Sequence, residues 1–271
     1  MAVIVMTSYH PELSSAHKNR LLCVSKRMRA DSYDEFVTFL EKDISEQFVR
    51  MESASDKHYC AKEDSITNEL AGNLINLGYD DADEQTKKNG AVDLTVSSSG
   101  YTWIAEAKLG KSNPQVFEGL LQLVTRYVKR DKQAGLLVYC QKAGAVTFFT
   151  NFSNYLKNKK WQQSATIAKD AKQLQKINNS FNSLTISNKE DYSFDLIVNK
   201  PSGVDLKVKC ICLDVAHEPM DASGRAANSL KLENARLDLI QIFEDWKETD
   251  FEDLDQAKLK IALGDFLEIK V

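Results

Sequence analysis

Asp93, Glu106 and Lys108 are side chains of the types that bind metal ions and hydrolyse phosphate esters. Glu106 and Lys108 stand two positions apart in a segment with strand periodicity, so both side chains leave the same face of that strand. Asp93 lies in the preceding strand-like segment. A tight hairpin between the two segments places its carboxylate beside that of Glu106.

Two carboxylates that converge on one point repel and raise each other's pKa unless a cation holds them. Oxygen ligands with room for water are what Mg²⁺ prefers. Lys108 can orient or deprotonate an attacking water and offset the negative charge of a phosphoryl transition state. The residues therefore predict a metal-dependent phosphodiesterase. The alternative is an exposed strand face on which Glu106 and Lys108 form an ordinary ion pair.

Hydrophobic periodicity predicts the strands that hold these residues. Apolar and polar residues alternate in 91–96 and again in 101–108, and the Ser-Ser-Ser-Gly sequence between them is typical of a turn. This pattern predicts a β-hairpin. The almost wholly apolar segment 135–140 predicts a further strand, buried in the middle of a sheet.

Helical spacing predicts the elements around the hairpin. One helix is expected over 33–53, and a second ends at Gly78, a residue type that favours the end of a helix. A third is expected over 114–131, with Pro114 in its first turn. The order helix, strand, strand, helix, strand indicates an α/β core.

In this order of elements, Asp93, Glu106 and Lys108 resemble the PD-(D/E)XK motif of the restriction endonuclease-like nuclease superfamily, with Val92 where the leading Pro would stand. The resemblance implies a restriction endonuclease-like core, with a mixed central sheet flanked by helices. It implies that Asp93, Glu106 and the main-chain carbonyl of Ala107 bind Mg²⁺, which Mn²⁺ can replace. It also implies that Lys108 positions and activates the hydrolytic water.

In this superfamily the helix before the hairpin often brings a further acid to the metal. Glu63 and Glu69 are the candidates in this chain. At about 100° per residue, Glu63 falls within about 20° of the apolar side marked by Leu70 and Leu77, whereas Glu69 lies about 100° away. We therefore expect Glu63 to be the additional metal ligand. An acid favoured by the dipole at a helix start is the alternative explanation of Glu63.

The helix after the motif carries a polar row. Gln122 and Arg126 are four residues apart, which resembles the Gln-x-x-x-Tyr motif of RecB-type nucleases, although Arg126 stands where the Tyr would be and Tyr127 comes one residue late. We expect Gln122 to act in catalysis. From residue 108 to 132 there are six cations and two acids, which favours contact with a nucleic-acid backbone. A solvated helix face is the alternative. The predicted nucleic-acid-binding residues are Lys111, Arg126, Lys129 and Arg130.

The second half of the chain is less informative. A short strand is expected over 146–149, a helical region over 152–177, and two strands over 192–198 and 204–214 around a turn. A helix over 228–246 leads to an acidic tail. The predicted organisation is a helical N-terminal extension (1–55), a nuclease-like core (56–216) and a helical C-terminal cap (217–271).

Composition excludes several other classes of protein. The 271 residues carry 35 Lys and Arg against 39 Asp and Glu, a net charge of -4, so nucleic-acid binding must depend on local basic patches. No apolar stretch is long enough to cross a bilayer, the start lacks a secretory pattern, and a cytoplasmic location is expected. Five scattered cysteines indicate reduced thiols, with no second Cys pair to complete a zinc site at Cys210 and Cys212. A Gly-rich phosphate loop is also missing.

The sequence thus predicts a Mg²⁺-dependent endonuclease acting on DNA, in restriction, anti-phage defence or DNA repair. RNA is a less favoured substrate. The flanking segments could form a homodimer or bind a partner protein. The alternative is a nuclease-fold subunit that binds DNA or protein without catalysis.

Overall fold

The computed structural model describes Ser14 and residues 30–83, 86–87, 91–164, 170–221 and 228–267. Its centre is a seven-stranded mixed sheet in the order β1-β4-β5-β6-β9-β8-β7, with a separate ribbon of β2 and β3. The strands are β1 (Asp81–Asp83), β2 (Thr86–Lys87), β3 (Ala91–Val92), β4 (Leu94–Ser98), β5 (Tyr101–Leu109), β6 (Gln133–Cys140), β7 (Thr185–Ser187), β8 (Ser193–Asn199) and β9 (Asp205–Asp214). Most of the predicted N-terminal extension before residue 30 lies outside the described residues.

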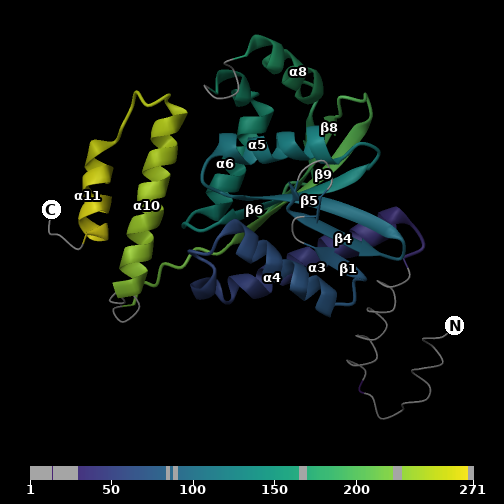
Figure 1. Ribbon diagram of the computed structural model, residues 1–271, viewed down its shortest axis with the longest axis horizontal. Helices are drawn as coiled ribbons and strands as arrows, with labels where there is room; N and C mark the ends of the chain where they lie inside the picture. Colours follow the sequence, from purple (N-terminus) through teal and green to yellow (C-terminus); the bar gives the residue numbers. More distant parts are fainter. Residues whose placement is uncertain are drawn as a thin grey trace.

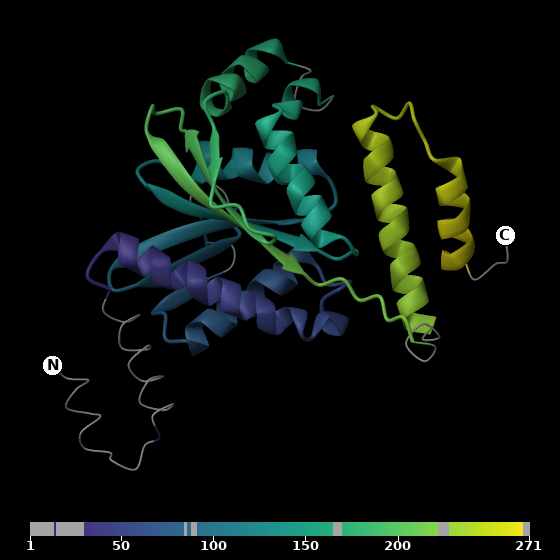
Figure 2. The same cartoon turned by 180° about the vertical axis from the view of Figure 1, so that it is seen from behind.

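Helices cover both faces of the sheet (Figures 1 and 2). Two of the described helices pack in the core on one face, three pack in the core on the other, and two form a hairpin at the side. The first pair is α3 (Tyr33–Glu52) and α4 (Glu63–Asn76); the opposite layer holds α5 (Asn113–Gln122), α6 (Ala145–Lys157) and α8 (Ala171–Phe181); the hairpin is α10 (Asn228–Glu248) and α11 (Gln256–Phe266). Three short turns complete the described helices: η1 (Ser55–Lys57), η2 (Leu123–Tyr127) and η3 (Lys160–Gln163).

Strand β5 supplies side chains to the two cores on opposite faces of the sheet. Ile104 packs in the core under α5 and α6, whereas Trp103, Ala105 and Ala107 pack in the core under α3 and α4. β5 pairs antiparallel with β4 and parallel with β6. The predicted hairpin is therefore confirmed for β4 and β5, and so is the buried strand that follows. The single strand expected over 91–96 was wrong, because the chain bends at Asp93: Val92 packs in the core under α5 and α6, whereas Leu94 and Val96 pack under α3 and α4.

The sequence signals expected at the start of α5 and at the end of α4 are present in the structure. Ser112 caps α5 by accepting a hydrogen bond from the Gln115 main-chain N–H, and Pro114 lies in the first turn. Gly78 has a φ of 97° directly after α4, a conformation that favours glycine. These local signals fix the start of α5 and the end of α4, whereas the start of α4, where Glu63 lies, has no side-chain cap.

Several predictions for the second half were wrong. Residues 146–149 belong to α6, because Phe149, Phe152 and Leu156 form a buried helical stripe that a four-residue window cannot reveal. The helix predicted over 114–131 ends at Tyr127 with the π-helical turn η2. The predicted helical region 152–177 is interrupted, since α6 ends at Lys157 and α8 begins at Ala171.

The helical hairpin of α10 and α11 lies beside the sheet and the helices that cover its two faces (Figure 1). The predicted helix over 228–246 is confirmed as α10, while α11 occupies part of the segment expected to be an acidic tail. Leu230 and Leu237 of α10 pack on Tyr59, in the loop before α4. Among the described residues, no helix is long and apolar enough to span a membrane.

Candidate active site

The candidate site lies where β5 continues past the end of β4. The antiparallel pairing of these strands begins at Leu94 opposite Ala105, but β5 runs on to Leu109 and stays paired with β6 on its other side. Because the N–H and C=O of one strand residue point to the same side, the main-chain groups of Ala107 and Leu109 face the place where β4 is missing. Unpaired main-chain groups of this kind need another partner.

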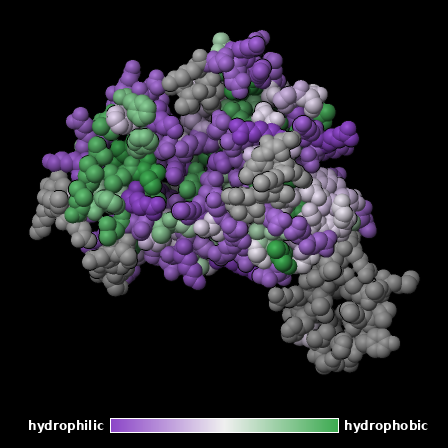
Figure 3. Space-filling model, in the orientation of Figure 1, coloured by the Kyte–Doolittle hydropathy of each residue, from purple (hydrophilic) through white to green (hydrophobic). Residues whose placement is uncertain are grey.

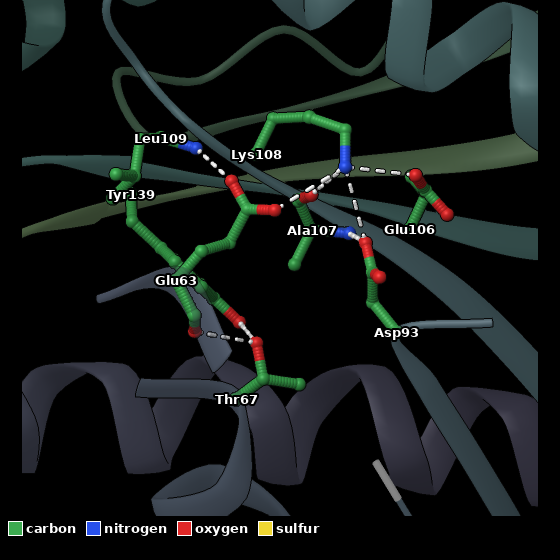
Figure 4. A network of polar contacts seen from close by, with 8 residues as sticks. All are labelled: Glu63, Thr67, Asp93, Glu106, Ala107, Lys108, Leu109 and Tyr139. Carbon is green, nitrogen blue, oxygen red and sulfur yellow. Dashed lines mark hydrogen bonds and ion pairs between the residues drawn. The ribbon is translucent and has the colours of Figure 1, made fainter. Parts of the chain in front are cut away.

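Two predicted acids occupy that place (Figure 4). Asp93, in the bend before β4, accepts the Ala107 N–H on Oδ2 at 2.9 Å. Glu63, the first residue of α4, accepts the Leu109 N–H on Oε2 at 2.7 Å. Side chains from two separate elements thus replace the missing strand. The main chain of β5 fixes the positions of both carboxylates.

The ammonium group of Lys108 lies between the acids (Figure 4). Lys108 Nζ is 2.8 Å from Glu106 Oε1, 3.3 Å from Asp93 Oδ2 and 3.3 Å from Glu63 Oε1. It also donates to the main-chain carbonyl of Ala107 at 2.7 Å. The structure therefore brings together all five groups that the sequence assigned to metal binding and water activation.

Burial and close charges shift the pKa values of Glu106 and Lys108. Glu106 is only 1% exposed, and its burial raises its pKa to about 7, with Asp93 adding to the rise and Lys108 opposing it. Burial works to lower the pKa of Lys108, but the carboxylates of Glu106, Asp93 and Glu63 raise it above its ordinary value. Three acids share one cation, so the site has an excess of negative charge that favours a further cation.

The donor atoms suit a hard divalent cation in type. Three carboxylates and one carbonyl provide oxygen ligands only, which Mg²⁺ prefers. Glu106 Oε2 is buried and has no hydrogen-bond partner, so one ligand atom is free. In the part of the chain that the structure describes, however, no three His, Cys, Asp or Glu side chains are arranged as a metal-binding group as they stand. Lys108 Nζ lies between the carboxylates, and a cation can bind there only when this ammonium turns aside.

Gly119 of α5 makes room for the stem of Lys108. A Cβ atom at position 119 would lie 2.6 Å from Lys108 Cγ and 3.1 Å from Cε. Such distances are far inside van der Waals contact, so a larger residue would push the lysine out of its present path. The glycine at this position thus serves the lysine side chain, although it costs helix stability.

Two buried hydroxyl groups hold the start of α4 from below (Figure 4). Thr67 Oγ1 donates to the main-chain carbonyl of Glu63 at 3.0 Å, and lies 3.0 Å from the hydroxyl of Tyr139 on β6. Because the single Thr67 proton is used on Glu63, the Tyr139 hydroxyl donates to Thr67. The pair links β6 to the helix start that carries the Glu63 carboxylate.

Tyr127 belongs near this site, and sequence reasoning assigned it no role. The Val128 N–H bonds to the Leu123 carbonyl, five residues back, so the π-helical turn η2 takes in one extra residue. Tyr127 is buried, and its pKa is raised by burial and then by the charges of Glu106 and Asp93. The signal in the sequence was the late Tyr itself, since an inserted residue in the helix brings it back toward the site.

The other predicted residues lie at varying distances from the carboxylates. Gln122, at the end of α5, is half-buried, and exposed Arg126 hydrogen-bonds Tyr127. Lys111 lies two residues after the end of β5. Lys129 and Arg130 lie before the start of β6, the opposite end from Val138, which pairs with Lys108. The last two therefore sit away from the acids, at the far end of the strand.

Glu69, the rejected alternative to Glu63, points elsewhere. Its Oε1 lies 3.6 Å from His58 Nε2, and its side chain is 48% exposed. The structure thus places Glu63, and not Glu69, among the candidate ligands. Comparison of the chain with known protein families, with curated proteins and with solved structures finds no match.

We predict that Thr67→Val costs more stability than the double change Thr67→Val with Tyr139→Phe. The single change leaves the Tyr139 hydroxyl buried without an acceptor, at a cost of about 1–3 kcal/mol, whereas the double change removes both polar groups. Urea unfolding of the two variants measures the difference. Thr67→Ser, which keeps the hydroxyl, is the control, and equal stability of the single and double variants would contradict the assignment.

Proposed function

We propose that this chain is a metal-dependent nuclease that hydrolyses DNA phosphodiester bonds. The observation that carries the proposal is the convergence of Glu63, Asp93 and Glu106 on Lys108 at the open edge of β5. The order of elements supports it: α4, the antiparallel strands β1, β4 and β5, then α5 and the parallel strand β6. Apart from the additional strand β1, this is the order that the resemblance to PD-(D/E)XK nucleases implies.

Glu63, Asp93, Glu106 and the Ala107 carbonyl would hold Mg²⁺ or Mn²⁺, which supplies charge to polarise the phosphate and acidify a bound water. With the carboxylates neutralised in this way, Lys108 no longer serves as their counter-charge. Its ammonium then turns toward the phosphate, where it orients the attacking water and offsets the developing negative charge.

The DNA backbone would approach from the side of α5 and η2. Arg126 is exposed beside Tyr127 there, and Lys111 stands at the other end of α5. Lys129 and Arg130 would contact phosphates farther from the cleaved bond. A role in restriction, anti-phage defence or DNA repair follows from the resemblance, the cytoplasm is the location expected from the sequence pattern, and RNA is the competing substrate.

A second candidate function is a nuclease-fold subunit that binds DNA or a protein without cutting. The observation that favours it is the position of Lys108, whose ammonium group bridges all three acids. In this reading the cluster is a structural ion-pair network. Metal binding and cleavage separate the two functions.

Glu106→Gln and Lys108→Met should each lower the rate of DNA cleavage in Mg²⁺ or Mn²⁺ at least about 100-fold, because each removes a group that acts on the transition state. Relaxation and linearisation of supercoiled plasmid measure the rate, with EDTA as the metal-free arm and single-stranded RNA as the competing substrate.

Matched controls for this assay come from the same fold. Glu69→Gln changes an acid on α4 that points away from the site. Lys209→Met removes a lysine that is 18% exposed, against 20% for Lys108, and that pairs with buried Asp195 at 3.1 Å. Both controls should cut at the wild-type rate. Cleavage that survives in Glu106→Gln and Lys108→Met would rule out this site.

Mn²⁺ at about 100 times its Kd should raise the thermal unfolding midpoint of the wild type by about 5 °C, because binding to the folded state alone stabilises it. Asp93→Asn should abolish the shift, and Glu69→Gln should keep it. Differential scanning calorimetry gives this result without any cleavage. A wild type that neither shifts nor cuts would support the non-catalytic subunit instead.

Gly119→Ala should reduce cleavage about 10- to 100-fold while leaving the unfolding free energy within about 1 kcal/mol of the wild type. The added methyl displaces Lys108, and small misplacements of a catalytic group are costly, whereas alanine favours the helix. Gly72→Ala on α4 is the control, since a Cβ there meets nothing within 4 Å. It should be stabilising and fully active. Equal cleavage by both variants would show that the Lys108 path is unimportant.

A further inference from the structure

Lys142 lies at the same end of the sheet as the candidate site. Strands β5 and β6 run parallel, with Leu109 opposite Tyr139, so the loops that follow the two strands leave the sheet at one end. Lys142 is the second residue after β6, as Lys111 is the second residue after β5. The side chain of Lys142 is 39% exposed. The loop after β6 therefore holds a cation that solvent can reach, next to the loop that follows Lys108.

Acids from the C-terminal part of the chain occupy this loop. Lys142 Nζ pairs with Oδ1 of Asp238 on α10. The next main-chain donor of the loop, the Ala143 N–H, bonds to Glu218 Oε1 at 3.4 Å. Ammonium groups and main-chain N–H groups are also the donors that proteins use to bind phosphate oxygens. The two carboxylates therefore occupy donors of the kind that a nucleic-acid backbone would use.

Helix α10 also reaches the residues around the candidate site. Gln241 Nε2 donates to the main-chain carbonyl of Lys111 at 2.7 Å. Leu237 and Gln241 line a small cavity of about 20 Å³ together with Leu109. Leu109 is the residue whose N–H binds the Glu63 carboxylate. The helix that carries Asp238 thus lies next to the main-chain donor of a proposed metal ligand.

The contact of α10 with the sheet and its covering helices is mostly polar. In the ranges that the structure describes, the buried apolar cluster that joins them consists of Tyr59, Leu230 and Leu237. A cleft of about 190 Å³ lies between the end of α10 and the start of α5. Figure 3 shows hydrophobic surface over the C-terminal helical hairpin and mainly hydrophilic surface beside it. An exposed ion pair contributes little stability in water, so another anion can replace Asp238 on Lys142.

We propose that Lys142 is a further contact for the phosphate backbone of DNA, and that Asp238 occupies it while DNA is absent. On binding, a phosphate oxygen replaces the Asp238 carboxylate on Lys142, and α10 loses this link to the loop. Asp238 is thus a built-in competitor that weakens the binding of DNA. The inference rests on the proposed nuclease function, because it concerns the backbone of the same substrate.

DNA suits this exchange better than a free anion does. The Asp238 carboxylate is tethered by α10, so its local concentration at Lys142 is high, and a free phosphate ion would gain only this one contact. A DNA strand bound at the site carries many phosphates. Its contact with Lys142 is then made within a complex that other cations, such as Lys111, already hold.

Asp238→Asn should bind DNA about 2- to 5-fold more tightly than the wild type, because it removes the competing charge and leaves Lys142 free for phosphate. Fluorescence anisotropy of a labelled DNA duplex measures the Kd. EDTA is present throughout, so that no strand is cut by a metal-dependent reaction. Both side chains of the pair are partly exposed, and circular dichroism should show that the variants fold.

Lys142→Met should weaken binding about 2- to 5-fold. It should also lower the slope of log Kd against log salt concentration by about one, because one phosphate contact is lost. The double variant Lys142→Met with Asp238→Asn should bind as Lys142→Met does, since without the lysine the acid has nothing to compete for. A tightening by Asp238→Asn that persists without Lys142 would overturn the inference.

Glu233→Gln is the matched control. It removes the same charge from α10, but Glu233 pairs with Arg236 of the same helix at 3.0 Å. Its Kd should equal that of the wild type. Equal tightening by Glu233→Gln and Asp238→Asn, or no tightening by Asp238→Asn, would overturn the inference and leave the nuclease proposal standing. A wild type that binds no DNA would also overturn it, and the plasmid assay then decides separately on the nuclease proposal.

Discussion

The rest of the site depends on the short length of β4, which begins only at Leu94, opposite Ala105. If β4 paired with β5 beyond Ala105, the main-chain groups of Ala107 and Leu109 would be used in the sheet. Because it does not, these N–H groups bind the carboxylates of Asp93 and Glu63 instead. Main-chain donors cannot swing away as side chains do, so acids from two distant parts of the chain are held in place before any cation or substrate arrives.

This arrangement brings three carboxylates together at a site where burial raises the free energy of a charged group. Lys108 relieves it in the structure as it stands, since its ammonium contacts all three acids. A buried cluster with more acids than cations stores unfavourable energy that a divalent ion can release. The overall net charge of -4 is therefore a poor guide to local charge, because three of the acids are gathered around Lys108.

Much of this site could be predicted because it rests on short-range periodicity. Alternation placed Glu106 and Lys108 on one face of a strand, and the helical phase distinguished Glu63 from Glu69. What could not be predicted depends on main-chain geometry or on contacts between distant segments. The π-helical turn that brings Tyr127 near the acids is one case, and the close approach of Gly119 to Lys108 is another. In α6 and α11 the apolar spacing was present. A four-residue window hid it in α6, and in α11 the segment was interpreted together with the acidic stretch that precedes it.

Helix α10 contacts the rest of the chain through three loops: the one before α4, where Tyr59 lies, and those after β5 and β6. Gln241 of α10 donates to the Lys111 carbonyl at 2.7 Å, three residues after Lys108, and Lys142 pairs with Asp238 nearby. The carboxylates take none of their hydrogen bonds from α10, since their donors are Ala107, Leu109 and Lys108. Loss of α10 would therefore free the loop that joins β5 to α5 but would leave the acids on their main-chain donors. The main chain of β5 thus fixes the positions of Asp93 and Glu63. Helix α10 instead contacts the loop between β5 and α5, beside which the proposed nucleic-acid backbone would lie.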